Sequence, residues 1–234
     1  MRLYIIRHAD PDYPNGTITA QGHREAAALA QRLVAERLDR LYSSPLQRAL
    51  DTARYTQDAL GMTPVVEDWM AELSEWHLDQ EPWKGLVAWD LPGEIIRGDE
   101  VFPSHDTWHR LSHLRDLRLE EKYETLIRDS DDFLRRHGYE RAGGRYRLAR
   151  PHRERIAVFC HNGLALTWLA HLLAIPLTLM WSSFWMAPSS VTTILFDERS
   201  PQWAVPRCIG FCDVSHLYAA GLPVQPRGIL ANFD

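Results

Sequence analysis

Residues 4–10 read YIIRHAD, and residues 157–163 read AVFCHNG. Each stretch is a short apolar run, typical of a buried strand, that ends on a histidine, His8 or His161. The carboxyl ends of parallel strands meet at one edge of a sheet, and ligands of such sheets bind there. The two stretches therefore predict that both imidazoles face one site.

Other runs rich in β-branched and aromatic residues complete the expected sheet. The expected strands are 2–7, 39–43, 64–67, 155–160 and 190–196, with a weaker one near 202–209. Residues 18–38 carry apolar side chains at helical period, and SPLQ at 44–47 is typical of a helix start with Ser44 as its N-cap. This alternation predicts an α/β fold of three layers, a mainly parallel sheet with helices on both faces.

The alternation of strands and helices is interrupted between residues 76 and 150. This stretch is rich in Trp, Pro and Gly at its start and becomes helix-like at 108–137. Long irregular segments inside a compact chain are usually lids or binding loops. We therefore expect residues 1–234 to form a single domain in which an inserted loop and helical lid at about 76–150 covers the site and selects the substrate.

Composition excludes several classes of function. The net charge of −5 and the pI of about 6.1 provide no basic field for a nucleic-acid backbone. Residues 161–196 contain no charged side chain, but Pro176, His171 and several hydroxyl residues favour a buried helix over a membrane span. Three cysteines without CxxC spacing and an N-terminus unlike a signal peptide favour a cytoplasmic protein with reduced thiols.

Charged residues accompany the two histidines. Arg7 precedes His8, and Arg48 lies one turn into the helix expected after the second strand. Two guanidinium groups, two imidazoles and a helix N-terminus at one edge predict an oxyanion pocket sized for a phosphoryl group. Nearby cationic charge disfavours imidazolium, so His8 is expected to remain neutral and able to act as a nucleophile.

Four motifs occur in the order of one known family. The chain resembles the histidine phosphatase (phosphoglycerate mutase-like) superfamily in RH at 7–8, SSPLQRALDTA at 43–53, MAE at 70–72 and CHNG at 160–163. Its residues 187–221 also resemble the tails of a bacterial branch of that superfamily.

The resemblance implies catalysis through a phosphohistidine, with neither metal nor cofactor. It implies that His8 attacks phosphorus while Arg7, Arg48 and His161 hold the phosphoryl oxygens. It also implies a carboxylic acid that protonates the leaving group, for which Glu72 in the MAE motif is the favoured candidate and Glu75 the competitor.

Further substrate contacts are expected from Asn15, Asn162 and Gly163. The chain departs from the family pattern at Ala9, where the family usually has glycine, and in DPDYPNG at 10–16. These departures affect the expected substrate contacts more than the catalytic group. A backbone with positive φ at residue 9 would be strained for alanine.

Three functions remain open at this point. The favoured one is hydrolysis of a small phosphomonoester; the alternatives are a phosphomutase using the same intermediate and a non-catalytic, phosphate-binding regulatory module. If their segment were helical, one face would contain His105, His109 and His113. We expect such a stripe to face solvent or to contact substrate, and a metal site is the less favoured interpretation. The role of the motif at 208–221 and the existence of a homodimer also stay open.

Overall fold

The structure is a computed structural model and describes residues 1–229. One eight-stranded sheet crosses this part of the chain. In spatial order it contains β5 (Val65–Val66), β4 (Arg40–Ser43), β8 (Arg155–Cys160), β1 (Arg2–Arg7), β9 (Val191–Asp197), β10 (Trp203–Asp213), β7 (Arg145–Leu148) and β6 (Tyr139–Ala142). The half from β5 to β1 is parallel, whereas the half from β9 to β6 pairs antiparallel.

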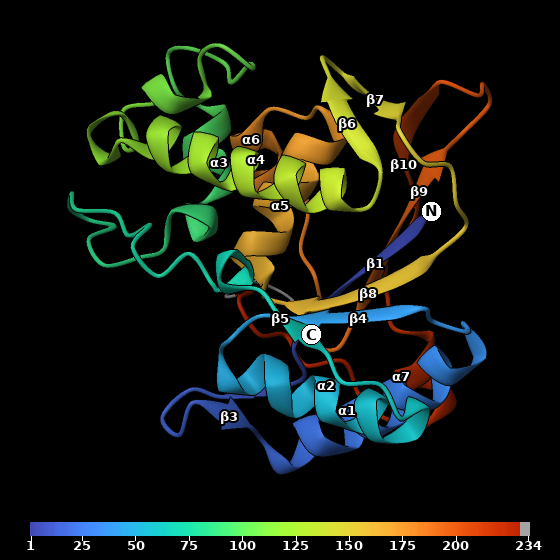
Figure 1. Cartoon of the computed structure of the whole chain (residues 1–234). Coiled ribbons are helices and arrows are strands. Elements are labelled where there is room, and N and C mark those ends of the chain that lie inside the picture. Colours follow the sequence, from blue (N-terminus) through green and yellow to red (C-terminus); the bar gives the residue numbers. More distant parts are fainter. Residues whose placement is uncertain (230–234) are drawn as a thin grey trace.

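Helices cover both faces of the sheet, which confirms the expected α/β class (Figure 1). One layer contains α1 (Ala20–Ala35), α2 (Gln47–Leu60) and the short α7 (Ser215–Ala219). The other contains α3 (Gly93–Arg97), α4 (Leu119–Arg136), α5 (Asn162–Leu173) and α6 (Leu177–Ser183).

The side chains of β1 alternate between two apolar clusters, one on each face of the sheet. Tyr4 and Ile6 lie in the apolar cluster formed with α1 and α2, whereas Leu3 and Ile5 lie in the larger cluster on the side of α4 and α5. Successive strand residues point to opposite faces, so an unbroken apolar strand serves both layers.

Residues 161–196, which contain no Asp, Glu, Lys or Arg, include the deeply buried helix α5. The first eleven residues of α5, through Leu172, are all buried, and the chain turns at Ala174 before Pro176 precedes α6. Within residues 1–229, no helix combines the length and apolarity that a bilayer crossing requires. The expectation of a buried helix in this stretch is confirmed.

Only part of the 76–150 segment lies near the carboxyl ends of the parallel strands. Residues 71–90 are largely irregular, and several of them line the cavity described below. By contrast, α4 packs against α5, and the β6–β7 hairpin extends the sheet at the edge next to β10. The segment thus supplies structural elements of the main fold as well as a cover for the cavity.

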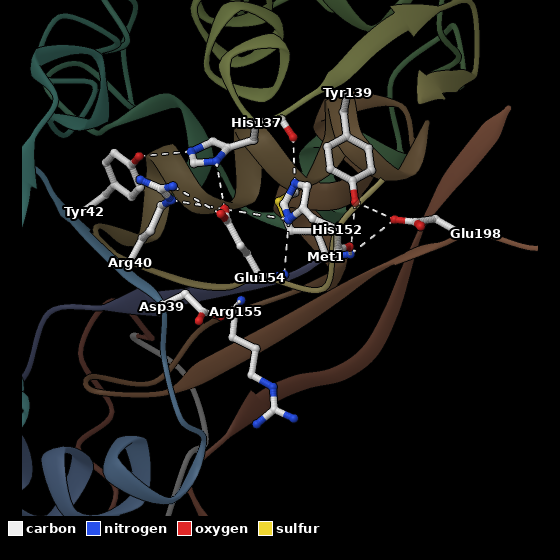
Figure 2. A network of polar contacts seen from close by, with 10 residues as sticks. All are labelled: Met1, Asp39, Arg40, Tyr42, His137, Tyr139, His152, Glu154, Arg155 and Glu198. Atoms are coloured by element: carbon white, nitrogen blue, oxygen red, sulfur yellow. Dashed lines mark hydrogen bonds and ion pairs between the residues drawn. The ribbon is translucent and has the colours of Figure 1, made fainter. Parts of the chain in front are cut away.

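The opposite end of the parallel strands is closed by a polar network (Figure 2). Glu154 lies between Arg40, His137 and His152, and Tyr139 contacts Glu198 beside it. This cluster at the amino ends of β4 and β8 lies at the far end of those strands from the cavity.

Candidate active site

The ends of β1 and β8 bring the two histidines together. The strands are neighbours in parallel register, with Arg7 opposite Cys160, and the backbone N–H of His8 donates to the Cys160 carbonyl at 2.9 Å. The ring centroids of His8 and His161 are consequently 5.2 Å apart. Both side chains are buried, so their spacing is fixed by the sheet.

The hydrogen bonds of His8 define which nitrogen is free. Nδ1 lies 2.8 Å from the carbonyl oxygen of Ala9, which can only accept, so Nδ1 carries the proton. Nε2 then keeps its lone pair, and it has no hydrogen-bond partner in the described part of the chain. Burial, followed by the charges of Arg7 and Arg48, lowers the pKa of His8 well below its ordinary value. The ring is therefore a neutral base and nucleophile at physiological pH.

The two arginines have unused donors next to this ring. Arg7 Nη1 donates to the carbonyls of Met186 at 2.5 Å and Arg227 at 3.1 Å, which fixes the guanidinium. Nε of Arg7 and Nε of Arg48 are buried and have no partner among residues 1–229. Buried donors are rarely left unpaired, so these atoms mark a place where an anion would be bound.

His161 lies behind His8. Its Nε2 is 2.7 Å from the hydroxyl of Ser44, and its buried Nδ1 has no partner within the described chain. Ser44 is thus used differently from our expectation, because α2 begins only at Gln47, with Leu46 as its N-cap. The Ser44 hydroxyl accepts the N–H of Leu46 at 3.1 Å and orients His161 instead of capping the helix in the expected way.

Glu72 lies at the N-terminus of α5. Its Oε1 accepts the N–H groups of Leu73 at 3.2 Å and Leu164 at 2.9 Å, and its Oε2 accepts that of Gly163 at 3.3 Å. Burial raises the pKa of Glu72, while these backbone donors and then Arg48 oppose the rise. Oε2 retains a lone pair that can carry a proton. Glu75 is exposed and does not line the cavity.

His8, the two arginines and Glu72 surround one cavity of about 320 Å³ that opens to solvent, whereas His161 lies next to His8 but does not line this cavity. Its walls are formed by Arg7, His8, Tyr13, Arg48, Glu72, Ser74, His77, Val87, Trp89, Asp90, Asn162 and Gly228. Glycine is required at position 163, because a Cβ there would lie 2.5 Å from Trp89 Cε2. Asn162 accepts the N–H of Met186 at 3.2 Å through Oδ1, which leaves its amide N–H groups for a ligand.

The sequence model of the histidine phosphatase superfamily (branch 1) matches residues 3–208. The chain belongs to this superfamily. Phosphoserine phosphatase 1 of Hydrogenobacter thermophilus is 31% identical over 97 residues, which are 38% of this histidine phosphatase chain and 44% of that relative. A second phosphatase of that bacterium is 34% identical over 82 residues, which are 31% of this chain and 40% of its own length. The chain thus spans less than half the length of the curated relatives it matches.

Solved structures show the same histidine phosphatase fold. A variant of phosphoserine phosphatase from Entamoeba histolytica, in complex with phosphoserine, matches with a TM-score of 0.59 and 20% identity over 92% of this chain and 98% of that one. The mycobacterial glucosyl-3-phosphoglycerate phosphatase complexed with VO3 matches with a TM-score of 0.56 and 21% identity, over 90% and 98% of the two chains.

The departures from the family pattern have physical explanations. Ala9 is buried without positive φ, and its N–H donates to Thr52 at 2.9 Å, so alanine is not strained there. Asn15 is exposed in a turn, where its amide donates to Asp12 at 2.8 Å. The structure does not bring Asn15 to the cavity wall, because the turn places it on the solvent side.

Several residues at the cavity were not predicted from the sequence, and two charged residues at or beside it, Asp90 and Arg227, are the most informative of those missed. Asp90 follows a segment with no clear period, and only the fold brings it to the cavity. Arg227 pairs with the buried carboxylate of Asp10, with Nε 2.6 Å from Oδ1, while its carbonyl accepts from Arg7. The sequence indicates Arg227 only indirectly. Asp10 directly follows Arg7-His8-Ala9 at the end of a buried strand, and a buried carboxylate needs a basic partner.

The remaining motifs take no part in the cavity. His105, His109 and His113 do not share a helix, because only a 3-10 turn at Trp108–Arg110 forms there. Among the described residues, no cluster of His, Cys, Asp and Glu could hold a metal ion. In the C-terminal motif, Asp213 pairs with Arg32 of α1 at 2.8 Å, and His216 lies 3.1 Å from the Ser189 hydroxyl. This motif therefore anchors α7 to the body of the protein.

Proposed function

We propose that the chain is a metal-independent phosphatase that hydrolyses small phosphomonoesters through a phosphohistidine at His8. One observation carries the proposal: the free Nε2 of a neutral, buried imidazole lies beside two arginines whose Nε donors have no partner in the described chain. The cavity of about 320 Å³ suits a small ester.

In the first step, Nε2 of His8 attacks phosphorus and the bond to the ester oxygen breaks. Arg7 and Arg48 hold the phosphoryl oxygens and stabilise their charge, as donors positioned in advance do for phosphoryl transfer. His161, next to His8, is the further donor that the family pattern implies. The Nδ1–H bond to Ala9 stabilises the positive charge that develops on the ring. Glu72, in its protonated form, gives its proton to the leaving oxygen.

In the second step, the Glu72 carboxylate accepts a proton from water, whose oxygen attacks the phosphoryl group. The P–N bond of the phosphohistidine breaks, its electron pair returns to Nε2, and inorganic phosphate leaves. Glu72 is then protonated again and the enzyme is ready for another cycle. The position of Glu72 at the α5 N-terminus supports its change between acid and base. The backbone donors stabilise the carboxylate, while burial favours the protonated acid.

The proposal is tested with an aryl phosphate in the presence of EDTA. We expect turnover, inhibition by vanadate, and a loss of at least about 10⁴-fold in kcat for His8→Ala. Full activity of that variant would contradict the proposal. Measuring released phosphate against isomerised phosphoester separates hydrolysis from mutase activity, and phosphate binding without any turnover would instead support a regulatory module.

A further inference from the structure

We infer that Ser44 is a positioning residue that fixes which nitrogen of His161 carries the proton, so that His161 presents Nδ1–H as a hydrogen-bond donor to a bound phosphoryl group. The inference rests on the proposed function and goes beyond it, because it assigns the tautomer of the second histidine and names the group that sets it. The Ser44 hydroxyl lies 2.7 Å from His161 Nε2, and both residues are buried.

The hydroxyl of Ser44 has a single proton to donate. Its oxygen already accepts the N–H of Leu46 at 3.1 Å, and within residues 1–229 the one acceptor that its proton reaches is Nε2 of His161. A buried hydroxyl proton without an acceptor costs free energy, so the hydrogen bond runs from Ser44 to His161. The lone pair of Nε2 is therefore used as the acceptor of this bond.

The imidazole of His161 is neutral, so it carries one proton. Burial is the largest influence that lowers the pKa of His161 well below its ordinary value, and the neighbouring His8 and Arg48 act in the same direction. With Nε2 accepting from Ser44, the proton lies on Nδ1, the buried nitrogen that has no partner in the described chain. The opposite tautomer would leave two buried groups unpaired, the Ser44 hydroxyl proton and the Nδ1 lone pair, whereas this one leaves a single N–H donor.

An unpaired N–H donor next to the nucleophile suits an anion. The ring centroid of His161 is 5.2 Å from that of His8, and a lone pair on Nδ1 would repel phosphoryl oxygens that an N–H attracts. Both imidazoles thus carry the proton on Nδ1 but use it differently. His8 donates its Nδ1–H to the Ala9 carbonyl and keeps the Nε2 lone pair for attack. His161 accepts from Ser44 through Nε2 and keeps its Nδ1–H for the phosphoryl group.

The tautomer is measured by long-range ¹H–¹⁵N correlation spectra of protein labelled with ¹⁵N-histidine, at about pH 7.5, above the pKa of an ordinary histidine. The signals of His161 are assigned by their loss in His161→Ala. We expect Nδ1 of the wild-type ring to be protonated and Nε2 to be unprotonated, and we expect Ser44→Ala to shift the ring toward the Nε2–H form. Added inorganic phosphate is expected to move the Nδ1 proton downfield, because a charged acceptor shortens the hydrogen bond.

A double-mutant cycle separates positioning from structure, because Ser44→Ala also removes the acceptor of the Leu46 N–H. We expect Ser44→Ala to lower kcat/KM for an aryl phosphate by about 10- to 100-fold, somewhat less than loss of the whole donor costs. When His161 is already alanine, the same substitution is expected to change kcat/KM by less than about threefold. Ser43→Ala is the matched control, because it removes a neighbouring buried hydroxyl, which donates to the Ser44 carbonyl at 3.0 Å, and leaves the His161 tautomer unchanged.

A wild-type His161 protonated on Nε2 would overturn the inference, because Ser44 would then be the acceptor. Equal losses from Ser44→Ala in both backgrounds would overturn it too, because Ser44 would then serve structure alone. An Nδ1 proton that does not move while the ³¹P signal shows phosphate bound would exclude His161 as its donor. The spectra need no turnover, so a wild type that hydrolyses no aryl phosphate would contradict the proposed function and leave the tautomer to be read independently.

Discussion

Histidines lie near both ends of the parallel strands, and the two groups differ in how their polar atoms are paired. At the amino ends, His137 Nε2 lies 3.0 Å from the Tyr42 hydroxyl, and His152 donates through Nε2 to the His137 carbonyl at 2.7 Å (Figure 2). Glu154 contacts the remaining nitrogens of both rings. Every imidazole nitrogen of this network therefore has a polar neighbour.

At the carboxyl ends, the pairing is incomplete. His161 Nδ1, Arg7 Nε and Arg48 Nε are buried without a partner in the described chain, and His8 Nε2 faces the cavity. Leaving buried polar atoms unpaired costs stability, so such atoms persist where a ligand completes them. The comparison teaches that unpaired donors gathered beside one cavity, more than the histidines themselves, distinguish this site from the paired network.

After His8→Ala, the largest effect at the site is expected at Glu72. In Glu72→Gln the side chain still reaches the backbone N–H groups of α5 but cannot donate a carboxylic proton. We expect kcat for an alkyl phosphate to fall by about 10²- to 10³-fold and kcat for an aryl phosphate, which needs less protonation, to fall much less. Steady-state kinetics with both esters provide the measurement. Glu75→Gln is the control, and a larger loss there than at Glu72 would reverse the assignment.

A smaller effect is expected at Arg227, which links the C-terminal segment 222–229 to the site. Arg227→Met removes the pair with Asp10 and loosens the carbonyl that holds Arg7. We expect inhibition by inorganic phosphate to weaken about five- to tenfold, because Arg7 loses its fixed position. Arg199→Met, which breaks an exposed pair with Asp197, serves as the control. Unchanged phosphate inhibition in the Arg227 variant would exclude a positioning role.

The smallest effect on activity is expected in the paired network, where a substitution changes stability instead. Burial lowers the pKa of His137 to about 4, so the unfolded chain takes up the proton near pH 6.5 while the folded chain does not. The free energy of unfolding therefore rises with pH between about 4 and 6.5. We expect His137→Gln to remove about 3 kcal/mol of this dependence, as measured by urea unfolding across that range. An identical slope in wild type and variant would contradict the structure of the network.

Sequence patterns predicted much of the fold because the buried strands are apolar on both faces. The bounds expected for β1 and β8 match the structure, and those for β4, β5, β9 and β10 differ by a few residues. The β6–β7 hairpin was missed because its arginine-rich sequence resembles a solvated loop. The late start of α2 was missed because the Ser44 hydroxyl contacts a histidine over a hundred positions away.

The residues of the candidate site likewise fall into those that the sequence could place and those that it could not. Arg7, His8, Arg48 and His161 could be placed together because strand ends and a helix start locate them. Asp90 and Arg227 could not, since irregular chain brings them to the site and no period fixes where such residues point. The position of Asn15 depends on a turn in which Gly16 has a φ of 70°. The local sequence did not determine whether this turn would direct Asn15 toward the cavity or toward solvent.

The most direct measurement is to trap the phosphoenzyme and map it. The enzyme is mixed with a labelled phosphoester in EDTA, quenched in alkali within one turnover, and digested for mass spectrometry. The account predicts an acid-labile, base-stable phosphoryl group on the peptide that contains His8, absent from His8→Ala. A phosphoryl group on any other residue, or turnover by wild type with no trapped phosphohistidine under single-turnover conditions, would contradict it.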